Sequence, residues 1–233
     1  MMSRPYYSDR HDAGRQLAEH LSQYKNQPNV LVLALPRGGV AVGYEVAQAL
    51  HAPLDVFVVR KLGLPGHEEY AMGAIASGGV RVMNPLPGIT VPPEALAAVL
   101  AKEQAELLRR EQLYRAQRPP IHIAGRTVIL VDDGLATGAT MRAAAVSVGQ
   151  QHPLRLILAV PVGAKDSCES LRDVADEMVC PAIPEPFHAL SLWYDYMPQA
   201  SDDEVRSLLQ KAWHEHAVYI RRTDIPAVHP AGH

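Results

Sequence analysis

Residues 128–141, VILVDDGLATGATM, form the stretch that decides the fold. An apolar run ends in two adjacent acids, Asp132 and Asp133, and a loop of small residues then leads into a helix. The first amides of a helix have no partner within it, and the helix dipole favours an anion beside them. Gly134 and Gly138 allow the backbone to approach that anion closely. The stretch therefore predicts a phosphate-binding loop after a buried strand.

The two acids predict a second binding function beside the loop. Asp132 and Asp133 follow a strand, and open α/β sheets bind their ligands at the carboxyl ends of strands. Each carboxylate can accept a hydroxyl hydrogen, so the pair suits a vicinal diol, and the pair and loop together suit a ribose 5-phosphate. The loop lacks the lysine of a P-loop and the GxGxxG of a dinucleotide fold, which disfavours triphosphate hydrolysis and NAD binding.

A more ordinary interpretation is that the acids cap the helix and that the glycines make a tight turn. Like charges side by side at a strand end require an external partner, which argues against this interpretation. We therefore expect a ligand site, to which Thr137 and Thr140 add hydroxyl donors.

Short apolar runs alternate with helical segments along most of the chain. The first run, residues 30–35 (VLVLAL), is apolar on both faces, as are the strands of a parallel sheet that is covered on both sides. Helices are expected at residues 40–50 and 140–150. This alternation predicts an α/β fold with a doubly wound, mostly parallel sheet. The other strands are expected at residues 54–59, 127–131, 154–160 and 177–180.

Three segments fall outside this alternation. Residues 9–24 have the pattern of an amphipathic helix, and residues 62–93 are rich in Gly and Pro, which indicates a loop or hairpin. A long helix is expected at about residues 92–117, and residues 181–199 are dense in Pro and aromatic residues. The apolar stripe of the long helix, expected to pack on the chain's own core, consists of Leu96, Leu100, Leu107 and Leu108.

These patterns divide the chain into three parts. Residues 1–180 are expected to form the core with the N-terminal helix and, as an insertion over residues 62–120, a flexible loop and the long helix. Residues 181–220 are expected to form a small C-terminal hood and a last helix, which opens on the capping sequence SDDE at residues 201–204. Residues 221–233 show no period and are expected as a loose tail.

The composition argues against several classes of protein. Of 233 residues, 48% are hydrophobic, and 22 basic against 25 acidic residues give a net charge of −3. The chain therefore lacks the overall basic field that a nucleic-acid or anionic-membrane partner favours, and no apolar run reaches the about 20 residues of a membrane span. The two cysteines, Cys168 and Cys180, exclude a disulfide framework or structural zinc. With no signal-peptide pattern at the start of the sequence, a cytoplasmic protein is expected.

The residues of the deciding stretch resemble a known motif. A strand, two acids and a Thr-Gly-x-Thr loop are similar to the 5-phosphoribosyl 1-diphosphate (PRPP) motif of type I phosphoribosyltransferases. Residues 35–39 (LPRGG) resemble the short pyrophosphate loop of that family, and residues 58–66 (VVRKLGLPG) resemble a strand end and mobile loop of its adenine and orotate branches. The resemblance spans roughly residues 28–180, and the long helix and aromatic segment resemble a subgroup without an agreed substrate.

The resemblance implies a reaction and a set of binding residues. The family transfers the ribosyl group of PRPP to a nitrogen nucleophile, here a nucleobase by expectation, and Mg²⁺ is held through the substrate phosphates. No metal ligand of the protein itself is expected, and a homodimer stays open. Asp132 and Asp133 would bind the ribose. The pyrophosphate would be bound by Arg37, Gly38, Gly39, Arg60 and Lys61, and the 5-phosphate by Gly134, Ala136, Thr137, Gly138, Ala139 and Thr140.

The basic residues also have an ordinary interpretation. Arg37 before two glycines could belong to a surface turn, and Arg60 and Lys61 could be a solvated strand end. Base-stacking is expected from Phe187, Trp193 and Tyr194, and the alternative is that these aromatics fill the core of a small subdomain.

A general base is expected on the mobile loop. Ala136 stands where the hypoxanthine-guanine branch has an acid, so a neutral purine needs a base from elsewhere. Glu69, next to Glu68, is the candidate that a closing loop brings to the nucleophile, and the alternative is a solvated pair on an exposed turn. The residues expected to act in catalysis are therefore Asp132, Asp133, Arg37 and Glu69.

Two other functions remain open. The chain could be a non-catalytic regulator that binds PRPP or a nucleotide, but a regulator of transcription needs a basic face, which the net charge of −3 disfavours. Nor does such a regulator need a flexible loop like the one expected at residues 62–80. An enzyme that makes or hydrolyses phosphoribosyl links to something other than a base is equally compatible with the pattern.

Overall fold

A parallel sheet forms the centre of the molecule in the computed structural model, which describes residues 6–84 and 88–223. Its five strands run in the order β2-β1-β6-β7-β8, and every neighbouring pair is parallel. In this register Ala34, Val131 and Ala159 lie side by side, so the segments that follow β1 and β6 leave the same edge. The strands are β1 (Val30–Ala34), β2 (Leu54–Val56), β6 (Thr127–Val131), β7 (Arg155–Ala159) and β8 (Glu177–Val179).

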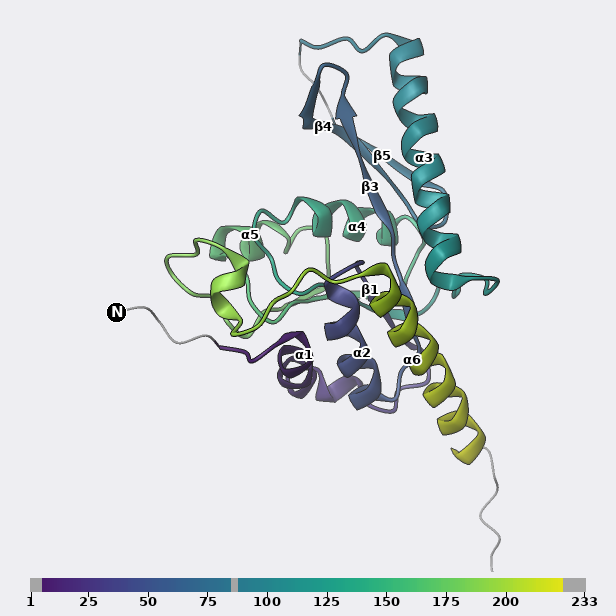
Figure 1. The fold of residues 1–233 in the computed structure, drawn as a ribbon, viewed down its shortest axis with the longest axis vertical. Helices are drawn as coiled ribbons and strands as arrows, with labels where there is room; N and C mark the ends of the chain where they lie inside the picture. The colour runs from purple at the N-terminus through teal and green to yellow at the C-terminus, as the bar shows by residue number, and fades with distance from the viewer. Residues whose placement is uncertain (1–5, 85–87, 224–233) are drawn as a thin grey trace, which may run out of the picture.

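Helices cover both faces of this sheet (Figure 1). A hydrophobic core lies on each face of the sheet, and alternate side chains of β1 pack into the two cores. Val30, Val32 and Ala34 belong to one core, and Leu31 and Leu33 belong to the other. The first core is closed by α1 (Arg10–Glu19), α2 (Gly39–Leu50) and α6 (Asp202–Thr223), and the second by α4 (Ala139–Gly149) and α5 (Lys165–Ser170). The predicted doubly wound α/β fold is thereby confirmed.

The insertion is a second sheet of antiparallel hairpins, so of the loop or hairpin that the sequence indicates the structure has the hairpin. The strands β3 (Val59–Leu64), β4 (His67–Ala76) and β5 (Val80–Met83) pair antiparallel, and α3 (Pro93–Arg115) packs along them. Figure 1 shows this sheet and α3 rising together from one side of the parallel sheet. A Cβ on Gly73 would lie 2.4 Å from the Val82 carbonyl, so this glycine serves close strand approach and not mobility.

Three predicted elements differ in detail from the structure. The expected strand at residues 54–59 is two strands, because the chain passes from one sheet to the other at residues 57–58. The N-terminal helix ends at Glu19 and is followed by a separate 3-10 turn, Ser22–Tyr24. Leu108, placed on the apolar stripe of α3, is 48% exposed, whereas Leu107 beside it is buried.

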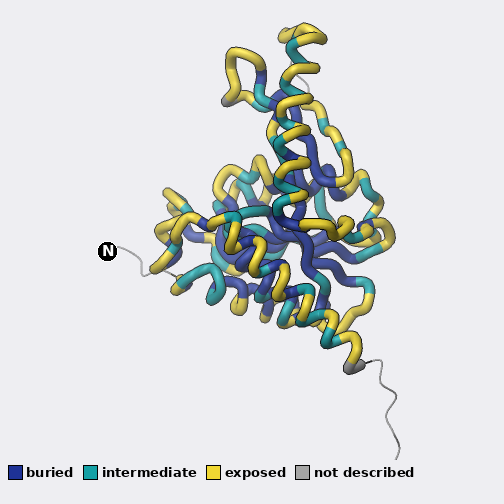
Figure 2. Tube along the Cα trace, turned by 45° about the vertical axis from the view of Figure 1, so that its right-hand side comes forward, coloured by how far each residue is buried: buried dark blue, intermediate teal, exposed yellow. Residues whose placement is uncertain are grey.

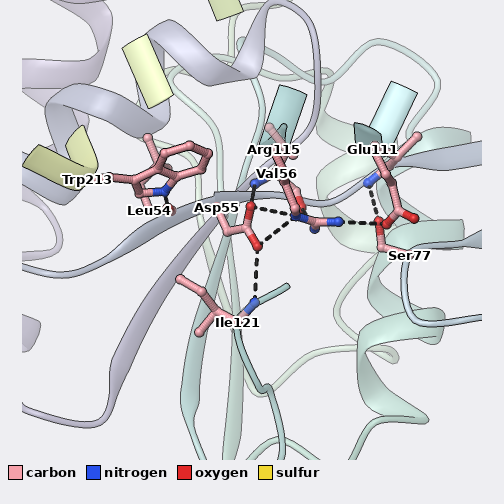
Figure 3. A network of polar contacts seen from close by, with 9 residues as sticks. Leu54, Asp55, Val56, Ser77, Glu111, Arg115, Ile121 and Trp213 are labelled. Carbon is pink, nitrogen blue, oxygen red and sulfur yellow. Dashed lines mark hydrogen bonds and ion pairs between the residues drawn. The ribbon is translucent and has the colours of Figure 1, made fainter. Parts of the chain in front are cut away.

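A buried ion pair fastens the end of α3 to the parallel sheet (Figure 3). Arg115 Nε donates to both carboxylate oxygens of Asp55 at 2.9 and 3.0 Å, and Arg115 Nη2 donates to the Val56 carbonyl at 2.6 Å. The same carboxylate accepts the Val56 amide at 2.8 Å and the Ile121 amide at 3.2 Å. Arg115 Nη1 also donates to Glu111 Oε1 at 2.8 Å. Arg115 and Asp55 are 5% and 2% exposed, so protein groups rather than water satisfy their charges.

The C-terminal part returns over the sheet edge and ends in a long helix. A 3-10 turn, η2 (Leu190–Trp193), lies in the expected hood, and α6 continues to Thr223, beyond the expected start of a tail at residue 221. Residues 224–233 lie outside the described part. Figure 2 shows buried chain at the centre of the molecule, where β1, β2 and β6 are buried throughout, and the outer end of the insertion exposed. Within the described ranges, no helix is both long and apolar enough to cross a membrane.

Candidate functional site

Two loops meet at the carboxyl edge of the parallel sheet. The Leu35 amide donates to the Val131 carbonyl at 2.9 Å, which brings the turn after β1 against the acids after β6. A Cβ on Gly38 would lie 1.9 Å from Asp133 Oδ2, and one on Gly39 would lie 2.9 Å from the Cα of Asp132. The predicted pyrophosphate loop and the acid pair are therefore in direct contact, and the two glycines make that contact sterically feasible.

The acid pair has a partner inside the protein that the sequence did not reveal. Arg10, the first residue of α1, donates from Nε to Asp133 Oδ2 at 2.7 Å. The Asp133 amide donates to Asp132 Oδ1 at 2.8 Å, so one oxygen of each carboxylate is held by a protein N–H. Arg10 is thus one partner for the pair from within the protein, but a single guanidinium faces two carboxylates, so the external ligand stays a prediction.

Burial and the adjacent Asp133 charge raise the pKa of Asp132 above its ordinary value, and the Arg10 charge opposes that rise. The folded protein therefore holds this proton more tightly than the unfolded chain does. It follows that the stability contributed by protonated Asp132 is lost as pH rises through its raised pKa.

The predicted phosphate loop presents unpaired amides to solvent. Two backbone hydrogen bonds fix Leu135. Its amide donates to the Val162 carbonyl at 2.9 Å, and its carbonyl accepts the Ala164 amide at 2.8 Å. By contrast, the amides of residues 136–140 have no acceptor within the described chain. Gly138, at φ +75°, turns the chain into α4. A fixed loop with free amides at the N-terminus of an eleven-residue helix is suited to an anion.

Arg37 lies half-buried in the turn after β1. Its guanidinium forms no ion pair or hydrogen bond with the described residues. It lies near the end of α3, where burial and a hydrogen bond to Asp202 raise the pKa of Tyr114 to about 12 and the Arg37 charge opposes that rise. A partly buried, unpaired guanidinium beside two glycines is available to an anionic ligand.

Arg60 and Lys61 share one cavity but differ in their other surroundings. Both line a cavity of about 380 Å³ beside α3, where Arg60 Nε and Nη2 donate to Glu103 Oε2 at 2.8 and 2.6 Å. Lys61 also lines a second cavity, of about 360 Å³, together with Ala139 and Thr140 of the phosphate loop. Of the two basic residues predicted for pyrophosphate, Lys61 therefore lies beside the loop, and Arg60 is paired with Glu103.

The aromatic residues of the hood are mostly interior. Trp193 and Tyr194 are 6% and 4% exposed and belong to a small core with Tyr7 and Val162. The Tyr194 hydroxyl donates to the Asp133 carbonyl at 2.6 Å, and Phe187 stacks on Trp193 with ring centroids 6.3 Å apart. The expectation that Trp193 and Tyr194 stack on a base is thus not met in this structure, because both rings fill a subdomain core.

The hood also closes directly over the motif. A Cβ on Gly134 would lie 2.1 Å from Leu190 Cδ1, so Leu190 covers the residue that follows the acids. No sequence motif around residue 190 predicts this contact. With Tyr194 bonded to Asp133, the hood is seated on the candidate site.

The predicted general base stays untested. Glu69 lies in β4, and its side chain is outside the described part of the structure. Glu68 lines a cavity of about 380 Å³ with Arg60, Lys102 and Glu103. Tyr70, the residue after Glu69, is 62% exposed. Across the described residues, no group of three or more His, Cys, Asp or Glu side chains could hold a metal ion.

Comparison with known proteins agrees with this geometry. The model of the phosphoribosyl transferase domain matches residues 7–190, which contain both loops, the acid pair and the second sheet. The chain belongs to the phosphoribosyltransferase family. Among solved structures, the crystal structure of TT1426 from Thermus thermophilus matches with a TM-score of 0.79 at 40% identity, over 88% of this chain and 98% of that one.

Two curated relatives extend the phosphoribosyltransferase comparison. A protein of Mycobacterium tuberculosis, provisionally named a phosphoribosyl transferase, is 46% identical over 213 residues, or 91% of this chain and 48% of its own length. This chain therefore spans about half of that relative. A Chloroflexus aurantiacus protein named bifunctional protein PyrR is 33% identical over 127 residues, which cover 53% of this chain and 65% of that protein.

Proposed function

We propose that this phosphoribosyltransferase domain binds PRPP with Mg²⁺ and transfers the phosphoribosyl group to a nitrogen nucleophile, with release of pyrophosphate. The observation that carries the proposal is the acid pair beside the loop of unpaired amides. The two hydroxyls of a ribose would donate to Asp132 and Asp133, and its 5-phosphate would accept from the amides of residues 136–140. Family membership supports the same assignment.

The chemistry needs charge compensation at the leaving group. The transition state resembles an oxocarbenium ion with a departing pyrophosphate, so cations placed at that group lower the barrier. Arg37 and the amides of the Gly38–Gly39 turn would bind the pyrophosphate, with Lys61 beside the phosphate loop. Mg²⁺ bound with PRPP would be held mainly by the pyrophosphate oxygens and would neutralise part of the charge on the leaving group.

The acceptor and its base belong to the same proposal. A nucleobase is the acceptor proposed, and Phe187, the least buried of the three aromatic residues predicted to stack, is the stacking residue that remains for it. Glu69 on β4 is the proposed general base, with Glu68 as its neighbour. Phe187 and Glu69 are proposed to act on the acceptor only. The proposed PRPP-binding residues do not depend on either assignment.

The experiment for this function is pyrophosphate release. The protein is incubated with PRPP, Mg²⁺ and a panel of purines, pyrimidines and small amines, and released pyrophosphate is measured together with the ribosylated product. Product formation with one member of the panel supports transfer. Pyrophosphate release at the same rate with and without every acceptor would contradict it and would favour hydrolysis of PRPP.

Arg37→Ala is expected to weaken PRPP binding while ribose 5-phosphate binding changes little, because Arg37 lies at the pyrophosphate turn and not at the 5-phosphate loop. Loss of a charge-assisted hydrogen bond predicts a loss of roughly tenfold to a hundredfold in PRPP affinity. Calorimetric titration with both ligands measures it. Arg81→Ala, an exposed arginine on β5, is the matched control and should leave both affinities unchanged. Equal losses for both ligands would contradict the assigned role.

The resemblance to bifunctional protein PyrR favours a second candidate function. In that case the domain binds PRPP or a nucleotide through the same residues and acts as a regulator without turnover. Tight PRPP binding with no product from any acceptor in the panel would support this alternative.

A further inference from the structure

Arg10 joins three parts of the chain that are far apart in sequence. It stands at the start of α1, and its Nε bonds to Asp133 Oδ2 across 123 positions of sequence, at 2.7 Å. Its Nη1 donates to the carbonyl of Pro198, near the end of the hood, at 2.6 Å. The side chains of Arg10 and Asp133 are 12% and 13% exposed, so water screens this ion pair far less than it screens a surface pair.

We propose that Arg10 is a positioning residue of the ribose site, which holds Asp133 so that the acid pair offers one oxygen of each carboxylate to the two sugar hydroxyls. This inference rests on the proposed function. The Arg10 bond occupies Asp133 Oδ2, and the Asp133 amide occupies Asp132 Oδ1. The other oxygen of each carboxylate receives no N–H donor from the described residues.

The packing around Asp133 explains why the arginine is needed to fix this arrangement. The Gly38 turn leaves no room on the Oδ2 side, because even a Cβ there would lie 1.9 Å from that oxygen and 3.1 Å from Arg10 Nε. Tyr194 fixes the Asp133 backbone through its carbonyl at 2.6 Å. The backbone is thus held by the hood, and the orientation of the carboxylate is held by Arg10.

The charges around the pair give Arg10 a second effect. Burial and the Asp133 charge raise the pKa of Asp132, and Arg10 is the cation that opposes this rise. The other titratable group facing the pair is the Tyr194 phenol, whose pKa is raised by burial and by the Asp133 charge, so it stays neutral. Arg37 lies on the adjoining turn. Without Arg10, the acids would retain a proton to higher pH, and a protonated carboxyl is a poorer acceptor for a hydroxyl.

The test compares Arg10→Gln and Arg10→Lys with the wild-type protein. Ribose 5-phosphate and inorganic phosphate are titrated by calorimetry at pH values on both sides of neutrality. Ionisation of the phosphate is common to all variants and cancels in the comparison. The matched control is Arg15→Gln, on the same helix, whose arginine is 58% exposed and pairs with Asp12 and Glu45.

Arg10→Gln is expected to weaken ribose 5-phosphate about tenfold or more near neutral pH and to shift the pH midpoint of binding upward, with inorganic phosphate unaffected. Arg10→Lys keeps the charge, so it should lose affinity with little shift of the midpoint. Arg15→Gln should behave as wild type. Thermal unfolding verifies that each variant is folded, and Arg10→Lys still tests the proposal if Arg10→Gln does not fold.

Two results would overturn the inference. One is an Arg10→Gln protein with the wild-type affinity and pH profile for ribose 5-phosphate. The other is an equal loss of inorganic phosphate, which would mean that Arg10 acts on the phosphate loop or on the fold. Failure of the proposed function is distinguishable from both, because the wild-type protein itself would then bind no ribose 5-phosphate.

Discussion

Replacing Asp132 and Asp133 together by Asn is expected to lower the affinity for ribose 5-phosphate by about 10²-fold or more, without unfolding the protein. Each carboxylate would accept one sugar hydroxyl, and a hydrogen bond to a charged group contributes about 1.5–3 kcal/mol. Loss of both therefore predicts about 3–6 kcal/mol, which corresponds to roughly 10²- to 10⁴-fold in affinity. Calorimetric titration of the double variant with ribose 5-phosphate measures this loss.

Asn keeps the shape of Asp and removes the Asp132 charge, which burial disfavours, but it leaves Arg10, 12% exposed, without its carboxylate partner. We therefore expect a lower stability of the double variant but a folded protein. Thermal unfolding of the double variant checks this. Asp166→Asn in the first turn of α5 removes an exposed acid outside the acid pair and serves as the control. An unchanged affinity in the folded double variant would remove the ribose assignment of the acid pair.

Arg115→Met is expected to lower the free energy of unfolding by about 3–5 kcal/mol, the usual loss when one partner of a buried ion pair is removed. The reason is visible in Figure 3: Asp55 would keep the Val56 and Ile121 amides but lose the guanidinium that compensates its charge. Because Asp55 is 2% exposed, water cannot replace that partner. Denaturant unfolding of the variant and of the wild-type protein measures the difference.

The comparison for this variant is Arg109→Gln on the same helix. Arg109 is 57% exposed and pairs with Glu106, so its loss should cost about 0–1 kcal/mol. An Asp55→Asn, Arg115→Met double variant should lose less than the sum of the single changes, since it leaves no buried charge. If Arg115→Met unfolds at the wild-type denaturant midpoint, the network does not fasten α3 as argued.

The sequence predicts the site well where a local pattern carries it. The strand, acid pair and glycine loop lie within fourteen residues, so the order of residues fixes their relation. The parallel register then places the turn of Arg37 at the same edge, as the alternation of strands and helices predicts. Leu190 and Arg10 reach the site through tertiary packing from distant segments, and no local pattern marks them.

Other differences between prediction and structure arise where the same residue types are compatible with two structures. Gly and Pro in the insertion indicate a loop, but Gly73 allows two strands to approach closely. Aromatic density predicts stacking and core filling equally, and burial assigns Trp193 to the core. The sequence does not predict that Arg60 pairs with Glu103 of α3, because the two residues are 43 positions apart.

The most direct test of the account is where ribose 5-phosphate binds. Amide proton–nitrogen spectra of the isotope-labelled wild-type protein are recorded during titration with this ligand. The account predicts that the amides of residues 136–140 shift most, together with those of Asp132 and Asp133, because these amides receive no intrachain acceptor or adjoin the bound hydroxyls. Saturable binding that leaves the amides of residues 136–140 unmoved would contradict it.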